Sequence, residues 1–173
     1  SSCSVVVDRG RWIARIEGML SEPDKPTPAR ERLFSGTGTL KTLGLFQLMV
    51  QSGMFIPAKE NNTFCLFSQI YSEIGDNQSI ENELSTYSYR LTRMKKFLAL
   101  SNPETLLLLD EFGTGSDPDL GGALAEAFFE SLYRKKIFAI LTTHYSNIKS
   151  RAVQLPQAVN GCMLFNPINL QPL

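Results

Sequence analysis

Two adjacent carboxylates after a run of leucines give the strongest chemical signal in the sequence. Asp110 and Glu111 follow the segment TLLLL, residues 105–109, and a turn of sequence Gly-Thr-Gly-Ser-Asp comes soon after them. A short unbroken apolar run between turns predicts a strand that is buried on both faces of a sheet. Ligands of open α/β sheets bind beyond the carboxyl ends of such strands, where Asp110 can hold Mg²⁺ and Glu111 can activate a water for attack on phosphorus. The alternative interpretation is a helix cap or a solvated turn.

The only histidine of the chain, His144, stands at the end of a second apolar segment, residues 136–144. Taken alone, a single histidine is more often a structural residue than a functional one. Its assignment therefore depends on whether it lies at the same sheet edge as Asp110 and Glu111. At that edge an imidazole can hydrogen-bond a γ-phosphate or the attacking water.

A Gly-rich turn before an apolar helix, residues 33–47, carries part of a phosphate-binding loop. That motif reads G-x-x-x-x-G-K-[ST]; its backbone N–H groups cradle phosphates and its lysine neutralises them. The pair Lys41 and Thr42 does not fit the motif, because Ser35 and Leu40 stand where the two glycines belong. Lys41 also falls inside the helix by its spacing, which indicates a solvated helix lysine.

Thr37 fits better as the hydroxyl that binds Mg²⁺. Gly36 then becomes the first glycine of the motif, and about six residues of the pattern x-x-x-x-G-K are missing between Gly36 and Thr37. A Gly-rich loop without a nucleotide has no partner for its N–H groups and is prone to disorder. We therefore expect a break in the chain between Gly36 and Thr37, and a deletion of the loop is the alternative.

The elements that must position these residues alternate between strand and helix. Apolar residues at helical spacing predict helices, while short β-branched, aromatic or leucine-rich runs predict strands. This alternation predicts an α/β layer fold with a largely parallel sheet. The expected strands cover residues 4–7, 63–75, 105–113 and 136–144, and the expected helices cover residues 39–52 with a stop at Gly53, 80–100, and 119–134 with Asp119 as cap.

Composition excludes several classes of protein. The 17 Lys and Arg residues balance the 17 Asp and Glu residues, so a strongly basic nucleic-acid surface is not expected on this segment. No apolar run approaches the length of a transmembrane helix, and we expect no membrane contact. The three scattered cysteines, Cys3, Cys65 and Cys162, indicate a reducing compartment, which predicts a cytoplasmic protein.

Several motifs from Gly36 onward resemble the ATPase domain of the MutS family. The resemblance is strongest to the bacterial branch that lacks the mismatch-reading domain and suppresses recombination. Two of the motifs, IGDNQSIENELSTYS and GTGSDP, separate this branch from the proteins of mismatch repair. The matching stretches are residues 39–45, 51–58, 74–88, 106–125 and 142–145.

The resemblance implies a three-layer P-loop NTPase of the ABC-ATPase type, with a mostly parallel sheet flanked by helices. It places the ATPase domain at residues 33–173 and leaves residues 1–32 as a poorly assigned N-terminal part or linker. The implied cofactors are ATP and Mg²⁺. Thr37 and Asp110 would hold the metal, while Gly36 would contact the nucleotide.

The same resemblance assigns the chemistry to Glu111, which would polarise the water, and to His144, which would help to position it. Ser85 lies where the family has a signature serine that contacts the γ-phosphate bound by the other subunit. From the residues alone, Ser85 and Thr86 at a helix start fit an anion site and a plain N-cap equally well.

Asp76 and Gln78 would help to sense the metal and the γ-phosphate. The resemblance also implies a homodimer with composite ATP sites, in which other parts of a larger protein contact branched or mismatched DNA and ribosomes. A nuclease module at the C-terminus is common in this branch, so we expect this chain to be a fragment.

Two alternatives remain open at the level of sequence. A transporter or chromosome-maintenance subunit of the ABC type predicts a signature of the form L-S-G-G-Q, whereas this chain has ELSTYS. A decayed, nucleotide-free binding module predicts the loss of Glu111 or His144, and both residues are present.

Overall fold

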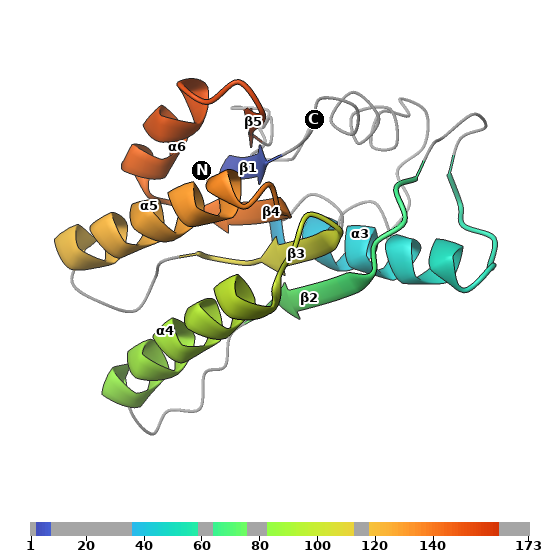
Figure 1. Ribbon diagram of the computed structural model, residues 1–173, viewed down its shortest axis with the longest axis horizontal. Coiled ribbons are helices and arrows are strands. Elements are labelled where there is room, and N and C mark those ends of the chain that lie inside the picture. The colour runs from blue at the N-terminus through green and yellow to red at the C-terminus, as the bar shows by residue number, and fades with distance from the viewer. Residues whose placement is uncertain (1–2, 8–35, 59–63, 76–82, 113–117, 163–173) are drawn as a thin grey trace, which may run out of the picture.

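The computed structural model describes residues 3–7, 36–58, 64–75, 83–112 and 118–162. These segments contain strands and helices in an alternating order (Figure 1). The strands are β1 (Cys3–Val7), β2 (Gln69–Glu73), β3 (Thr105–Leu109), β4 (Phe138–Thr143) and β5 (Ala158–Cys162). The helices are α3 (Gly36–Gln51), α4 (Glu83–Leu100), α5 (Pro118–Arg134) and α6 (Ser146–Val153).

The five strands form one sheet in the order β2-β3-β4-β1-β5. Strands β2, β3 and β4 are parallel, with Leu109 of β3 paired to Leu141 of β4, so their carboxyl ends meet at one edge. Strand β1 is antiparallel to both β4 and β5. The expected mostly parallel sheet is therefore confirmed, and β1 is the exception among the described strands.

The sheet is covered by helices on both faces, which gives three layers (Figure 1). On β3, Leu107 and Leu109 pack into a core with α4, α5 and α6, while Leu106 and Leu108 pack on the other face against α3. This alternation follows from the two-residue period of a strand, and all four leucines are buried because both faces are covered. The expected α/β fold of three layers is confirmed.

Helix α3 approaches the sheet closely at Gly44. A Cβ added to Gly44 would lie 2.8 Å from Cδ1 of Leu108, which is nearer than side chains tolerate. Glycine thus lets the helix axis come near β3, and Leu40 and Leu43 of the same helix are buried there. Gly53 lies two residues beyond the end of α3 and has a left-handed backbone conformation, with φ 73°. The sequence predicts a helix stop at this glycine.

Strand β2 is shorter than the predicted strand at residues 63–75. The side chain of Gln51 replaces a strand partner for Phe67: its Nε2 donates to the Phe67 carbonyl at 3.0 Å, and its Oε1 accepts from the Phe67 N–H at 2.9 Å. Gln47, fully buried beside it, donates to the Cys65 carbonyl at 2.8 Å. These amides satisfy the backbone before β2, so pairing with β3 starts only at Gln69.

One helix start differs from the predicted one. Helix α5 begins at Pro118 instead of being capped by Asp119, because proline has its φ preset for the first helical position and lacks the N–H that would be unpaired there. Helix α4 is described from Glu83, and the residues before it lie outside the described ranges. Among the helices that the structure describes, none combines the length and apolar character needed to span a membrane.

Candidate functional site

Asp110 lies directly beyond the carboxyl end of β3. Its backbone N–H donates to the Glu73 carbonyl at 2.8 Å, which continues the parallel pairing with β2. The four buried leucines before it fix the strand, while the Asp110 side chain is only half-buried. The fold therefore delivers one carboxylate to the edge of the sheet.

Two threonine hydroxyls converge on the Asp110 carboxylate. Thr37 donates to Oδ2 at 2.5 Å, and Thr142 donates to Oδ1 at 2.6 Å. Thr37 is in the first turn of α3 and Thr142 is near the end of β4, so three separate elements meet at one side chain. Hydrogen bonds from neutral hydroxyls to an ionised carboxylate are short and roughly twice as strong as neutral ones.

Thr142 was not predicted as a site residue. Its hydroxyl also accepts the backbone N–H of Glu111 at 2.8 Å, so it joins the two acidic residues that follow β3. The side chain is 3% exposed. The sequence carried only an indirect signal, a threonine in the TTHY motif, because its contact with Asp110 depends on the register between β3 and β4.

Glu111 takes a left-handed backbone conformation with φ 46°. For a residue other than glycine this conformation costs about 1–3 kcal/mol and persists where neighbouring contacts hold it. Those contacts are the bond to Thr142 and the next N–H, of Phe112, which donates to the Thr142 carbonyl at 2.8 Å. The Phe112 ring is buried against Phe128, and the Glu111 side chain is left exposed at the site edge.

His144 is the first residue after β4 and its side chain is exposed. The preceding residue, Thr143, is buried and donates from its hydroxyl to the Phe112 carbonyl at 3.1 Å. The same hydroxyl accepts the Tyr145 N–H at 3.2 Å. His144 thus stands at the carboxyl edge of the sheet, on the strand beside the one that carries Asp110 and Glu111.

The remaining predicted residues are only partly covered by the described structure. Ser85 is the third residue of α4, near the start of that helix, and nothing is described of its side chain. Asp76 and Gln78 lie outside the described residues. Of the predicted site residues, the structure brings Thr37 and Asp110 into direct contact.

The predicted break between Gly36 and Thr37 is wrong. Helix α3 begins at Gly36 and continues through Thr37 without interruption, so the two residues are consecutive in one helical turn. The x-x-x-x-Gly-Lys part of the motif is therefore absent from this chain. A phosphate loop also needs a strand that runs toward the helix start. Among the described residues, the strand that precedes α3 in the sequence is β1, which runs the other way because Val7 at its end pairs with Ala139 near the beginning of β4. Residues 8–35, between β1 and α3, lie outside the described ranges.

The donor set at the edge fits Mg²⁺ better than it fits a triphosphate. Mg²⁺ takes hard oxygen ligands and is usually held by one or two carboxylates together with water and phosphate oxygens. The Thr37 hydroxyl and the Asp110 carboxylate supply such oxygens. In the described part of α3, the first basic residue is Lys41, one turn beyond Thr37, and its side chain is exposed. The phosphate side of the site thus lacks the lysine that the motif provides.

Comparison with known proteins places these features in a family. Residues 34–167 match the family described as MutS domain V, which is an ATPase domain. Proteins named Endonuclease MutS2 from Halothermothrix orenii, Clostridium tetani and Lactobacillus acidophilus are 46%, 43% and 44% identical over 136 residues, or 79% of this chain. The chain spans only 17% of the length of each relative. Because the family match includes well over half of the residues, the chain belongs to the MutS domain V family.

Proposed function

We propose that this domain binds Mg²⁺ and ATP at the edge formed by the start of α3 and the ends of β3 and β4, and hydrolyses the nucleotide. The observation that carries this proposal is the 2.5 Å contact between the Thr37 hydroxyl and Asp110. In P-loop NTPases a hydroxyl at the helix start and an Asp after a buried strand hold the Mg²⁺ together. Bound there, the ion supplies positive charge beside the phosphates.

In this proposal, each side chain at the sheet edge has a separate role in hydrolysis. Glu111, exposed beyond β3, accepts a proton from the attacking water. His144, exposed beyond β4, hydrogen-bonds the water or the γ-phosphate. Thr142 orients the Asp110 carboxylate through one oxygen and leaves the other to Thr37.

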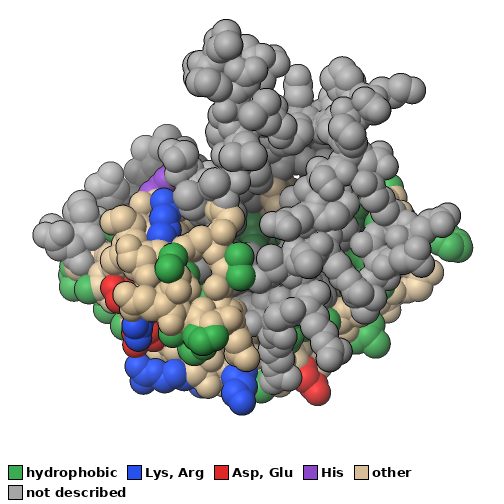
Figure 2. All heavy atoms as spheres, turned by 90° about the horizontal axis from the view of Figure 1, so that it is seen from above, with side chains coloured by type: hydrophobic (Ala, Val, Ile, Leu, Met, Phe, Trp, Pro, Cys, Tyr) green, Lys and Arg blue, Asp and Glu red, His purple; other side chains and the backbone are tan. Residues whose placement is uncertain are grey.

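In the whole protein we expect the domain, at residues 33–173, to work as a dimer on DNA. Ser85 at the start of α4 would then complete the nucleotide site of the second subunit. DNA contact would come from other parts of the protein, because the formal charge is zero and the described side chains in Figure 2 show basic groups scattered among acidic and apolar ones. The relatives' name, Endonuclease MutS2, is consistent with action on nucleic acid.

A second candidate function is a nucleotide-free module of the same family. The uninterrupted helix from Gly36 to Thr37 favours it, because the loop glycine and lysine that grip phosphates are absent. The intact contacts among Thr37, Asp110 and Thr142 favour the ATPase instead. The two functions differ in whether Mg²⁺ makes ATP bind.

Titration calorimetry with ATP, with and without Mg²⁺, separates the two functions. We expect weak ATP binding that requires Mg²⁺ and is lost in Asp110→Asn, because the amide cannot replace the charged ligand. Glu104→Gln is the matched control, since it removes the same charge from an exposed position just before β3, at the opposite end of that strand. If the wild type, Asp110→Asn and Glu104→Gln all show no ATP binding, with or without Mg²⁺, the nucleotide-free module is supported.

A further inference from the structure

The connection that carries His144 is short. Strand β4 ends at Thr143 and α6 begins at Ser146, so His144 and Tyr145 are the whole link between them. Helix α6 has only eight residues, and its N-cap residue Tyr145 makes no side-chain capping bond. A helix of this length is marginal on its own, so its position must come from tertiary contacts.

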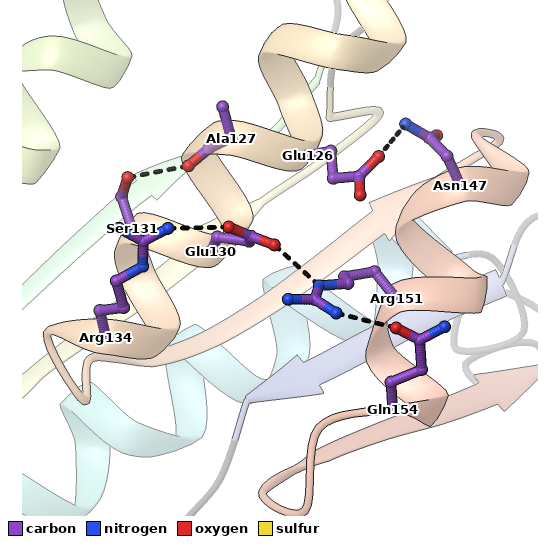
Figure 3. A network of polar contacts seen from close by, with 8 residues as sticks. All are labelled: Glu126, Ala127, Glu130, Ser131, Arg134, Asn147, Arg151 and Gln154. Atoms are coloured by element: carbon purple, nitrogen blue, oxygen red, sulfur yellow. Dashed lines mark hydrogen bonds and ion pairs between the residues drawn. The ribbon is translucent and has the colours of Figure 1, made fainter.

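Asn147, in the first turn of α6 and three residues after His144, makes two side-chain hydrogen bonds to α5. Its Nδ2 donates to the Gly122 carbonyl of α5 at 2.8 Å and to Glu126 Oε2 at 2.9 Å. Both hydrogens of the amide are therefore used on the neighbouring helix. Figure 3 shows the Asn147 side chain pointing from α6 toward Glu126 on α5.

Gly122 allows the two helices to meet at this level. A Cβ at position 122 would lie 3.3 Å from Cδ1 of Tyr145 and 3.5 Å from Nδ2 of Asn147. The Tyr145 ring thus rests against the first turns of α5, beside the amide contact. Tyr145, directly after His144, and Asn147 therefore both contact α5.

A second contact joins the helices one turn further from the site. Arg151 donates from Nε to Glu130 Oε1 at 2.7 Å, and Arg134 pairs with the other oxygen of Glu130 at 2.9 Å (Figure 3). The hydrogen bond from Arg134, followed by that from Arg151, lowers the pKa of Glu130 below its ordinary value. Residues 147 and 151 are four apart, as are residues 126 and 130, so the contacts form two rungs between neighbouring helical faces.

The strands beneath these rungs are joined as well. Thr143, just before His144, donates to the Phe112 carbonyl, and Phe112 follows Glu111. His144 is therefore fixed from its amino side through β3 and from its carboxyl side through α5. The attachment to α5 depends on the hydrogen bonds of Asn147 to Gly122 and Glu126.

We propose that Asn147 is a positioning residue that holds His144 in place at the carboxyl edge of the sheet by tying the start of α6 to Gly122 and Glu126 of α5. This inference rests on the proposed function, in which His144 contacts the water or the phosphate. The Arg151–Glu130 rung stabilises the same helix pair but lies too far along α6 to fix His144. The two rungs thus have separable roles.

The test compares Asn147→Ala with Arg151→Ala in the complete chain, by backbone ¹⁵N relaxation. Both variants lower Tm, since each removes contacts between α5 and α6. We expect the order parameter of the His144 amide to fall from about 0.85 to below about 0.6 in Asn147→Ala and to stay near the wild-type value in Arg151→Ala. An unchanged His144 amide in Asn147→Ala, or equal loosening in both variants, would overturn the proposal.

A polarity swap tests whether the hydrogen bonds of residue 147, and not the volume of its side chain, hold His144. Asn147→Asp places a carboxylate against Glu126 and the Gly122 carbonyl, and it should loosen His144. Adding Glu126→Gln lets the new amide on α5 donate to the carboxylate introduced on α6, and it should return part of the lost order. If the wild-type chain hydrolyses ATP, Asn147→Ala should lower kcat and leave KM for ATP nearly unchanged. Absence of turnover in the wild type would count against the proposed function, whereas the order parameters would still decide the role of Asn147.

Discussion

The two halves of the candidate site differ in how completely the chain builds them. At the ends of β3 and β4, Asp110, Glu111 and Thr142 are linked by hydrogen bonds of 2.6 and 2.8 Å. At the start of α3, Thr37 reaches Asp110, but the loop that should precede it is absent. We refer to these as the metal half and the phosphate half.

The difference shows which parts of such a site depend on the sheet alone. The metal half follows from parallel register, because adjacent buried strands deliver their next residues to one edge. The phosphate half needs a loop of specified length, and the x-x-x-x-Gly-Lys segment of that loop is absent between Gly36 and Thr37. The comparison can be tested in two backgrounds: the chain as it is, and a chain with x-x-x-x-Gly-Lys inserted between Gly36 and Thr37, which completes the motif.

The largest expected effect comes from breaking the metal half in the completed chain. Glu111→Gln should lower turnover by roughly 10²–10⁴-fold, because the amide cannot accept a proton from the water. ATP affinity should stay unchanged, since the loop, Thr37 and the metal grip the phosphates. Slow hydrolysis should also trap a closed dimer, which light scattering with ATP measures as a doubled mass. Near-normal turnover would refute Glu111 as the base.

Completing the phosphate half should have the next largest effect. A lysine paired with a phosphate and backbone donors around it contribute about 2–5 kcal/mol, so ATP affinity should rise by a factor between roughly 30 and several thousand. The measurement is the ATP dissociation constant with and without the insertion. An insertion with Met in place of its lysine is the control and should recover only part of the gain. If the complete insertion leaves affinity unchanged, the nucleotide-free function is favoured.

The sequence predicted the metal half better than the details around it. The leucine run and the acids after it were enough to place Asp110 at a buried strand end, since a short apolar run has few other uses in an α/β fold. Thr142 was missed, because its role requires the register between two strands. The start of β2 was missed because the Gln51 amide satisfies the Phe67 backbone in place of a strand. The direction of β1 has no signature in five residues.

A smaller effect should follow from removing the Thr142 hydroxyl. Thr142→Val keeps the shape but leaves an Asp110 oxygen and the Glu111 N–H without this partner, a cost of about 1–3 kcal/mol. For a chain of this size we expect Tm to fall by roughly 2–4 °C for each kcal/mol. Thr143→Val is the matched control, since it is equally buried and also loses two contacts.

The two threonine variants should differ in Mg²⁺-dependent ATP binding measured by calorimetry in the completed chain. Thr142→Val frees the Asp110 carboxylate to turn and should weaken binding, whereas Thr143→Val should leave it near the wild-type value. Equal weakening in both would mean that Thr142 acts through stability alone. The metal half would then consist of Thr37 and Asp110 without support from β4.

The smallest expected effect concerns Lys41, the basic residue of α3 nearest to the phosphate half. Lys41 is exposed, so Lys41→Met in the chain as it is should change ATP affinity by no more than about 0.5 kcal/mol, the usual range for surface substitutions. Thr37→Val is the positive control, because it removes the hydroxyl that contacts Asp110. Thr37 and Lys41 are four residues apart on one helical face, and helical side chains lean toward the amino end. A tenfold loss of ATP affinity in Lys41→Met would therefore mean that this lysine reaches the start of α3 and takes the place of the missing loop lysine. The chain would then build the phosphate half more completely than the fold indicates.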